Sequence, residues 1–351
     1  MTERIMASIR EIAEIKAHPN ADKLDIAVID GWQLVTAKDN GFKTGDVVVY
    51  FEIDSWIPTE IAPFLSKGKE PREYNGVKGE RLRSIKLRGE LSQGLILPLE
   101  VAFKLMNAQE ALQIKTGDDV TLLLNIQKWE RPMNPQLAGQ AKGYFPEFIR
   151  KTDQERIQNH FKTMQPEHFE DVYEVTLKLD GSSMTVFVKD GVYGVCSRNL
   201  ELKMVDDEGL PINQENAFIK KAAELGLESK LLAYSKNIAL QGELWGVGIN
   251  GNWEGVNHHE YSVFDVFDID SQSYLSAHER KQVCEDLNLQ HVPVLEYSNL
   301  STFNSVQDFL QYAERPSINN KVAEGVVFKS TTNPNYSFKA VSNSYLLNGG
   351  E

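Results

Sequence analysis

Cysteine, long apolar runs and positive charge are all scarce in this chain of 351 residues. The two cysteines, Cys196 and Cys284, provide neither a disulfide framework nor the paired spacing of a structural zinc site, which agrees with a reducing compartment. No apolar run approaches the roughly 20 residues that span a bilayer, and the N-terminus lacks the apolar core of a signal peptide. We therefore expect an intracellular monomer, cytoplasmic if it is cellular, without membrane association.

The net charge of −13 argues against indiscriminate binding to nucleic acid, because nonspecific affinity comes from Lys and Arg side chains that neutralise phosphates. The charge is distributed unevenly, however. A local excess of cations lies between residues 67 and 88, made up of Lys67, Lys69, Arg72, Lys78, Arg81, Arg83, Lys86 and Arg88 against three glutamates. Such a segment on an acidic protein predicts selective docking of nucleic acid, and a solvated loop is the alternative.

Short strands separated by turn signals fill residues 6–124. The expected strands are 24–29, 32–37, 46–53, 81–87, 94–98 and 119–124, and one helix is expected near 99–112. This inventory is that of a small Greek-key β-barrel with a basic loop.

Two segments of this module resemble the tRNA-binding type of OB-fold. They are residues 17–24, Ala-His-Pro-Asn-Ala-Asp-Lys-Leu, and residues 88–94, Arg-Gly-Glu-Leu-Ser-Gln-Gly. The resemblance implies an oligonucleotide-binding OB domain over residues 1–125, and we expect its nucleic-acid contacts at Arg81, Arg83, Lys86 and Arg88. His18 could be a further contact, although a histidine before Pro-Asn is more often a turn residue.

The composition of the sequence changes at residues 126–165, where prolines and glycines interrupt any long helix or strand. We interpret this stretch as a linker. Phe145, Phe148 and Ile149 are too apolar for a free linker, so its later part should pack on the next domain, and Lys151 and Arg156 could reach a pocket there. Residues 166–351 combine strands at 172–177, 184–188 and 192–196 with helices at 214–227, 277–287 and 305–312, which predicts an α+β domain of antiparallel sheets with helices outside.

Lys178 stands where the strand 172–177 ends, before an Asp180-Gly181 turn and a second strand. A lysine there could project into a cleft as a nucleophile, with a carboxylate two residues away. A solvated lysine beside an ordinary turn is the alternative. Further strand-like pieces carry polar residues that hydrophobic alternation does not explain, at 196–199, 241–246, 261–265, 324–329 and 337–341.

In this order and at these spacings, the pieces resemble the motif set of the covalent nucleotidyltransferases, which are DNA ligases, RNA ligases and mRNA capping enzymes. The match covers about residues 172–347. An OB-like module before the catalytic domain resembles the RNA ligase family known from Deinococcus and Naegleria. The implied fold class is α+β, with an OB-like β-barrel followed by a nucleotidyltransferase (ATP-grasp-like ligase) domain over 166–351.

The resemblance implies an ATP-dependent RNA ligase. Lys178 would attack the α-phosphate of ATP to form a lysyl-AMP, AMP would pass to an RNA 5′-phosphate, and a 3′-hydroxyl would displace it. Burial and neighbouring positive charge would activate such a lysine by lowering its pKa. The implied cofactors are ATP and a divalent metal, Mg²⁺ or Mn²⁺, and the implied partner is RNA or an RNA-containing duplex with a nick.

The same resemblance implies a role for each residue of these motifs. The catalytic set is Lys178, Asp180, Glu243, Glu324 and Lys339. The metal would be held, through water, by Asp180, Glu243 and Glu324. Phe264 would stack on adenine, although alone it reads as a core residue, and Lys339 with Lys329 would grip the α-phosphate. The full set of nucleotide contacts is Thr176, Leu177, Lys178, Arg198, Glu243, Phe264, Glu324, Lys329 and Lys339.

Two departures from the pattern bear on the interpretation. Val341 stands where many ligases carry a second lysine, so either Lys329 compensates or Ser337 faces the missing charge. Ser183 stands where DNA ligases usually carry arginine, which favours an RNA ligase. A capping-type guanylyltransferase and a non-catalytic RNA-binding protein with a degenerate ligase domain are the alternatives. Two adjacent histidines, His258 and His259, are interpreted as structural because neighbours on a strand point to opposite faces.

Overall fold

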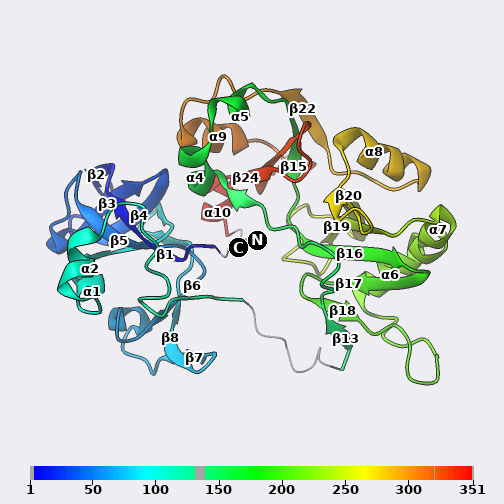
Figure 1. Cartoon of the computed structure of the whole chain (residues 1–351), viewed down its shortest axis with the longest axis horizontal. Helices are drawn as coiled ribbons and strands as arrows, with labels where there is room; N and C mark the ends of the chain where they lie inside the picture. The colour runs from blue at the N-terminus through cyan, green and yellow to red at the C-terminus, as the bar shows by residue number, and fades with distance from the viewer. Residues whose placement is uncertain (1–3, 131–138, 320, 350–351) are drawn as a thin grey trace. The chain divides into compact units, whose positions relative to one another are not determined.

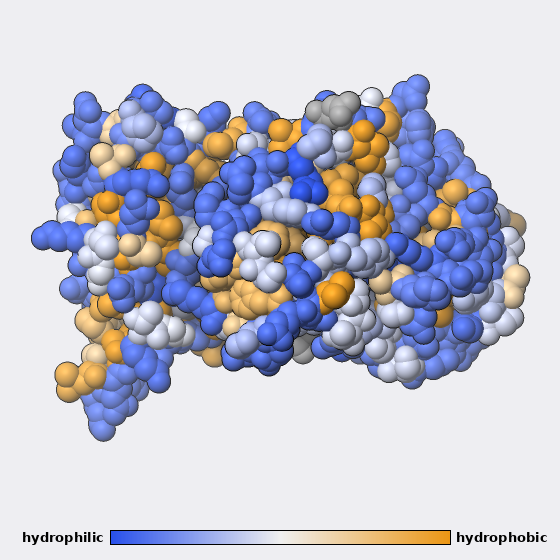
Figure 2. Space-filling view, turned by 90° about the horizontal axis from the view of Figure 1, so that it is seen from above, coloured by the Kyte–Doolittle hydropathy of each residue, from blue (hydrophilic) through white to orange (hydrophobic). Residues whose placement is uncertain are grey.

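The computed structural model describes residues 4–130, 139–319 and 321–349. Its elements divide between two compact units, one made of residues 1–132 with 346–351 and the other of residues 133–345 (Figure 1). The face drawn in Figure 2 is largely hydrophilic with apolar residues scattered among the charged ones, as expected for a chain in which 25% of residues are charged. No helix among the described residues is long and apolar enough to cross a membrane.

The N-terminal unit consists mainly of short antiparallel strands in several small sheets. One sheet has the order β1 (Ala7–Glu11), β5 (Val47–Phe51), β11 (Leu95–Pro98), and a second has the order β2 (Glu14–Ala17), β3 (Leu24–Ile29), β4 (Trp32–Ala37). A hairpin joins β9 (Ile85–Leu87) to β10 (Glu90–Ser92), and a fourth sheet has the order β12 (Gln127–Lys128), β6 (Ser55–Pro58), β8 (Val77–Arg81), β7 (Arg72–Tyr74). The described pairings do not close these sheets into the expected barrel.

Strand β5 contributes to two hydrophobic cores of this unit, because its successive side chains point to opposite faces. Val49 and Phe51 pack into a cluster with Met6, while Val48 and Tyr50 point the other way, into a cluster around Trp32. Successive side chains of a strand face opposite sides, so a continuous apolar run such as residues 47–51 is suited to lie between two cores.

Three expectations for the N-terminal unit were wrong in detail. The strand expected at 81–87 is instead the end of β8 and the separate strand β9, which belong to different sheets. The single helix at 99–112 is two short helices, α1 (Glu100–Phe103) and α2 (Ala108–Gln113), and the Asn107 side chain caps the second. Residues 119–124 form no strand; they make turns, with one bridge between Ser8 and Asp119. Val120 and Leu124 both enter the core, and the spacing of four between them belongs to a helical turn.

Two larger sheets form the second unit. A seven-stranded sheet has the order β13 (Ala141–Tyr144), β18 (Leu200–Leu202), β17 (Val192–Cys196), β16 (Ser182–Lys189), β19 (Ile238–Gly246), β20 (His259–Asp268), β21 (Ser273–Tyr274). A five-stranded sheet has the order β14 (Glu155–Arg156), β24 (Ser337–Val341), β23 (Gly325–Ser330), β15 (Tyr173–Lys178), β22 (Val294–Ser298). Among the described strands of these two sheets, every ladder is antiparallel except that of β14 with β24, and one isolated parallel bridge joins Val263 to His291; this agrees with the expected α+β class.

Helices accompany both sheets. On the seven-stranded sheet, α6 (Ala217–Glu224), α7 (Leu227–Tyr234) and α8 (Ala277–Asp286) share its core, and on the five-stranded sheet α4 (Ile157–His160) and α9 (Val306–Ala313) do the same. The shorter helices are α5 (Pro166–Glu170) and α10 (Asn343–Leu347), and a 3₁₀ turn spans Phe161–Thr163. The N-terminal unit has 3₁₀ turns at Lys38–Asn40 and Pro63–Ser66. The expected helix at 214–227 is shorter in the structure, where α6 ends at Glu224. Gly226, with a φ of 63°, is the N-cap residue of the separate helix α7.

The later part of the linker packs on the second unit. Phe145 and Ile149 lie in one buried cluster with Phe187 and Phe267, and Phe148 packs against it. The Gln241 side chain donates to the carbonyl of Arg150 over 2.8 Å, and the Tyr274 hydroxyl donates to the same carbonyl over 3.2 Å. These contacts fix the path of the chain just before residues 152–154.

We expect Phe309→Ala to lower the free energy of unfolding of the second unit by roughly 3–5 kcal/mol, the cost of emptying a buried phenylalanine site. Phe309 is fully buried and its ring contacts those of Phe303, Phe328 and Phe338. Urea denaturation followed by circular dichroism measures the change. The control is Gln311→Ala, an exposed site on the same helix, and equal stability losses in the two variants would contradict the assignment of this core.

Candidate active site

A pocket of about 620 Å³, including open solvent at its mouth, lies between the two sheets of the second unit. The five-stranded sheet contributes residues from β15, β23 and β24, and the seven-stranded sheet contributes residues from β16, β19 and β20. Its lining is Thr152, Asp153, Gln154, Thr176, Leu177, Lys178, Leu179, Ser183, Arg198, Glu243, Phe264, Val292, Val327, Lys329 and Lys339.

Lys178 is the last residue of β15 and its Nζ lies 2.6 Å from Glu324 Oε1. The two residues meet because Lys178 pairs with Gly325 across the sheet, directly after Glu324. The lysine side chain keeps 24% of its surface exposed, whereas the glutamate is almost fully buried. Lys178 therefore lies at the pocket wall beside a carboxylate, and the interpretation as an isolated surface lysine does not describe it.

The Asp-Gly turn after Lys178 is required by close packing. A Cβ on Gly181 would lie 2.4 Å from the Leu244 carbonyl oxygen and 2.8 Å from Glu243 Cγ, so a larger residue would push the turn away from β19. Asp180 next to it accepts a 3.4 Å hydrogen bond from the Asn250 side chain. The turn thus brings Asp180 and Glu243 to the same side of the lysine.

The acidic residues are crowded and poorly solvated. Burial, with the charge of Glu324, raises the pKa of Asp180 to about 6, against the opposing effect of Lys178 and of hydrogen bonds from Asn250 and Tyr345. Burial also raises the pKa of Glu243 to about 8, and the charges of Glu324 and Asp180 act in the same direction.

Three crowded carboxyl groups, Asp180, Glu243 and Glu324, supply the oxygen ligands that Mg²⁺ and Mn²⁺ prefer, so their chemistry fits a divalent cation. Within the part of the chain that the structure describes, no three His, Cys, Asp or Glu side chains are grouped to ligate an ion directly. The arrangement is compatible with a metal held through water, which is the mode expected from the sequence.

Cationic side chains line the pocket or lie next to it: Lys339 and Arg198 are part of the lining, whereas Arg156 and Lys151, which the sequence suggested could reach the pocket, are not. Burial, followed by the charge of Lys178, lowers the pKa of Lys339 to about 8. Arg156 pairs with Lys339 in the parallel β14–β24 ladder. Arg198 lies 3.6 Å from Asp153, and Lys151 donates to the Asn199 side chain over 3.1 Å. The pocket can therefore place several positive charges around a polyphosphate.

Phe264 reaches the pocket from a β-bulge. In the β19–β20 ladder Gln241 pairs with Asp265 but Gly242 pairs with Val263, so Phe264 has no partner opposite it. A bulge leaves one residue unpaired and changes where its side chain points. The ring is half-buried and lines the pocket, as a base-stacking residue must.

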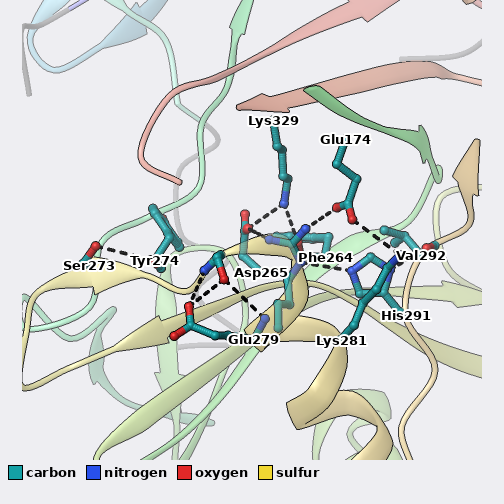
Figure 3. A network of polar contacts seen from close by, with 12 residues as sticks. Glu174, Phe264, Asp265, Ser273, Tyr274, Glu279, Lys281, His291, Val292 and Lys329 are labelled. Carbon is teal, nitrogen blue, oxygen red and sulfur yellow. Dashed lines mark hydrogen bonds and ion pairs between the residues drawn. The ribbon is translucent and has the colours of Figure 1, made fainter. Parts of the chain in front are cut away.

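Lys329 is already engaged in this structure. Its ammonium lies 2.5 Å from Asp265 Oδ1 and donates to the carbonyl of Phe264, and the residue is buried (Figure 3). Burial lowers its pKa to about 8, against the opposing charge of Asp265. Lys329 thus lines the pocket but binds the backbone of the bulge, so this geometry does not offer its ammonium to the α-phosphate.

Most residues chosen from the sequence meet at this pocket. The lining includes Thr176, Leu177, Lys178, Arg198, Glu243, Phe264, Lys329 and Lys339, while Glu324 pairs with Lys178 and Asp180 lies in the adjoining turn. Sequence reasoning missed the segment 152–154 and the apolar Leu179, Val292 and Val327.

His258 and His259 contact Glu260 and the Val247 carbonyl respectively, and no metal site among the described residues includes them.

The basic segment of the N-terminal unit is partly neutralised. Arg72 pairs with Glu80, Lys78 lies 2.9 Å from Glu70, and Arg81 lies 2.5 Å from Asp54 while stacking over the Trp129 ring at 3.9 Å. Among residues 4–130, the cations that form no ion pair include Arg83, Lys86 and Arg88, on or beside the β9–β10 hairpin.

His18 and Asn20 brace this hairpin. His18 is buried; its Nδ1 accepts from the Asn20 amide over 3.1 Å, so Nε2 carries the proton and donates to the Leu87 carbonyl over 3.1 Å. The Asn20 side chain donates to the Arg88 carbonyl over 3.0 Å. His18 is therefore a turn residue, and the two segments that resemble the tRNA-binding OB-fold are in contact.

Comparisons with known proteins agree with this geometry. A family model described as RNA ligase matches residues 171–341, and a model of an OB-fold domain matches residues 6–99. A Naegleria gruberi RNA ligase structure is 40% identical over 98% of each chain, with a TM-score of 0.80. The chain belongs to the RNA ligase family.

Other solved structures of the Naegleria gruberi RNA ligase are equally similar. One contains AMP and Mn (40% identity, 98% of each chain, TM-score 0.80), and one contains pyrophosphate (40% identity, 99% of each chain, TM-score 0.80). A search of curated protein sequences gives no match. The expected family, and its order of an OB-fold domain before a ligase domain, are confirmed.

The lowered pKa of Lys339 gives a pH-dependent prediction for this RNA ligase. Lys339 is charged below about pH 8 and neutral above it, so the KM for ATP should rise as the pH increases from 7 to 9.5, by roughly tenfold if one charge-assisted contact is lost. The initial rate of adduct formation at a series of ATP concentrations measures it. Lys339→Arg, which stays charged, should flatten the profile, and an equally steep profile in that variant would assign the titration to another group.

Proposed function

We propose that this RNA ligase uses ATP to join RNA 3′-hydroxyl and 5′-phosphate ends, at nicks in duplexes, through lysyl-AMP and RNA-adenylate intermediates. The observation that carries the proposal is the placement of Lys178 beside Glu324 in a pocket that also contains Phe264 and Lys339. Solved structures of the Naegleria relative with ATP or AMP and Mn support ATP and a divalent metal as cofactors.

In the first step Lys178 Nζ attacks the α-phosphorus of ATP. An N–P bond forms, the bond from the α-phosphorus to the bridging oxygen breaks, and pyrophosphate leaves with the electron pair. The attacking amine must first lose a proton, and Glu324 Oε1, 2.6 Å away, is placed to accept it. Lys339 faces the same pocket and can neutralise charge that develops on the phosphoryl oxygens.

The metal would be held by water bound to Asp180, Glu243 and Glu324. When bound, it would neutralise phosphate charge and help pyrophosphate to leave. The chain itself contributes the carboxyl groups and their position, through the Gly181 turn and the hydrogen bonds to Asp180. The apolar end of the pocket, with Phe264, Val292 and Leu177, suits the base.

Incubation with labelled ATP or GTP and a divalent cation should give a covalent protein adduct from ATP alone. Lys178→Ala should reduce that adduct to background, because the nucleophile is removed. A labelled adduct from GTP alone would contradict the proposal and support a capping-type guanylyltransferase. No adduct from either nucleotide would also contradict it and support a non-catalytic RNA-binding protein. Thermal unfolding of the variant establishes that it is folded.

The hairpin with Arg83, Lys86 and Arg88 is the surface that we propose for RNA docking. These cations form no ion pair among residues 4–130, so their positive charge is available to phosphates. Asp54 and Trp129 already engage Arg81, which makes it a weaker candidate than the sequence implied. The brace from His18 and Asn20 keeps the hairpin in one position.

Reversal of two of these charges, Arg83→Glu with Lys86→Glu, should lower sealing of a nicked duplex about tenfold at moderate salt and leave adduct formation within about twofold. The control is Lys104→Glu with Lys115→Glu, the same change of net charge at exposed sites of the same unit. Gel assays of sealing and of adduct formation measure both steps. Equal losses in the two double variants would contradict a local docking site.

A further inference from the structure

Arg280 links the structural elements around the nucleotide pocket without lining it. It projects from α8, and 2% of its surface is exposed. Its Nη2 donates to the carboxylate of Glu174 on β15, and its Nη1 lies 3.7 Å from Asp265 on β20. Its Nε donates to His291 Nε2 over 3.0 Å. One guanidinium therefore contacts both sheets and the segment that precedes β22.

Two of these partners, Asp265 and His291, each adjoin a residue of the pocket in the sequence. Asp265 follows the bulged Phe264 and also receives the Lys329 ammonium. His291 precedes Val292, and its Nδ1 donates to the Val292 carbonyl over 2.6 Å (Figure 3). Because Nε2 accepts from Arg280, the ring proton must lie on Nδ1. Burial, with the charge of Arg280, lowers the pKa of His291 to about 4 and keeps the ring neutral.

The segment around Val292 connects the two sheets. The Val263 amide donates to the Gln290 carbonyl over 2.8 Å, and the Val292 amide donates back to the Val263 carbonyl over 2.9 Å. On the other side the Leu177 amide donates to the Pro293 carbonyl over 2.9 Å. The position of Val292, Phe264 and Leu177 relative to one another thus depends on this connection, which Arg280 contacts through His291.

A purely stabilising role explains this arrangement poorly. Buried ion pairs add little net stability, because removing the charges from water offsets their attraction, and apolar residues could fill the same space. A planar guanidinium, by contrast, fixes several acceptors in set directions, which a lysine ammonium does not. The partners of Arg280 are tied to the base end of the pocket, so fixing their directions fixes the pocket.

We propose that Arg280 is a positioning residue for the nucleotide base: through Asp265 and His291 it sets where Phe264 and Val292 lie. This role rests on the nucleotide site proposed above. Arg280 is not among the residues that line the pocket, so we expect it to act on binding of the base and to leave the chemistry at the α-phosphate to the residues that do line it.

The test is Arg280→Lys, which keeps the positive charge but lacks the planar guanidinium group that binds several acceptors at once. The KM for ATP in adduct formation should rise about tenfold, while kcat at saturating ATP stays within about threefold and the adduct remains specific to Lys178. A lower melting temperature with an unchanged KM would overturn the proposal and leave a structural role. Loss of kcat in a folded variant at unchanged KM would overturn it as well.

Two further variants keep the test decisive. His291→Gln retains Arg280, and we expect the KM for ATP to rise in the same direction; an unchanged KM would contradict the proposal even if Arg280→Lys does not fold. Arg315→Lys is the matched control, since Arg315 stacks on Tyr312 at 3.9 Å and donates to its carbonyl away from the pocket, and its KM should equal that of the unaltered chain. Absence of any adduct in the unaltered chain would reject the nucleotide site itself.

Discussion

The alignment of β15, β23 and β24 determines where the charged groups of the five-stranded wall lie. Lys178 pairs with Gly325, and Gly325 pairs with Val341; Thr176 pairs with Val327, which pairs with Lys339. Because side chains alternate along a strand, a slip of one residue would turn each of these groups to the other face. Gly325 allows the alignment, since a Cβ there would lie 2.1 Å from the Ala340 carbonyl oxygen.

The same alignment accounts for the consequence of valine at position 341. Val341 is buried in the row that contains Lys178, and Ser337 lies in the row that contains Lys329. The Lys329 ammonium binds Asp265 and the Phe264 carbonyl. Lys329 therefore supports the bulge in this geometry and does not replace the second lysine of other ligases. Lys339 is therefore the one cation of β24, and the pocket lining also contains Arg198.

A local signal in the sequence marked Lys178, which stands at a strand end before Asp180-Gly181. The other pocket residues chosen from the sequence were assigned by the resemblance to the nucleotidyltransferase motifs and not by local patterns. Neither the local signal nor the resemblance identified residues 152–154, since their position depends on hydrogen bonds from Gln241 and Tyr274, which are 91 and 124 residues from Arg150. The β-bulge at Phe264 is only weakly indicated by the sequence. Tyr261 and Val263 are core residues at odd positions and Val266 is at an even one, a change of phase that an extra residue in the strand produces.

Burial in the pocket disfavours the charged forms of its acidic and its basic side chains alike, because it raises the pKa of Glu243 and Asp180 and lowers that of Lys339. A cation relieves the first group, and a polyphosphate relieves the second. Either ligand alone would meet like charges on the opposite wall, whereas both together leave each group paired. The charges of this site would therefore be balanced by nucleotide and metal in combination, which is the condition that the proposed attack by Lys178 requires.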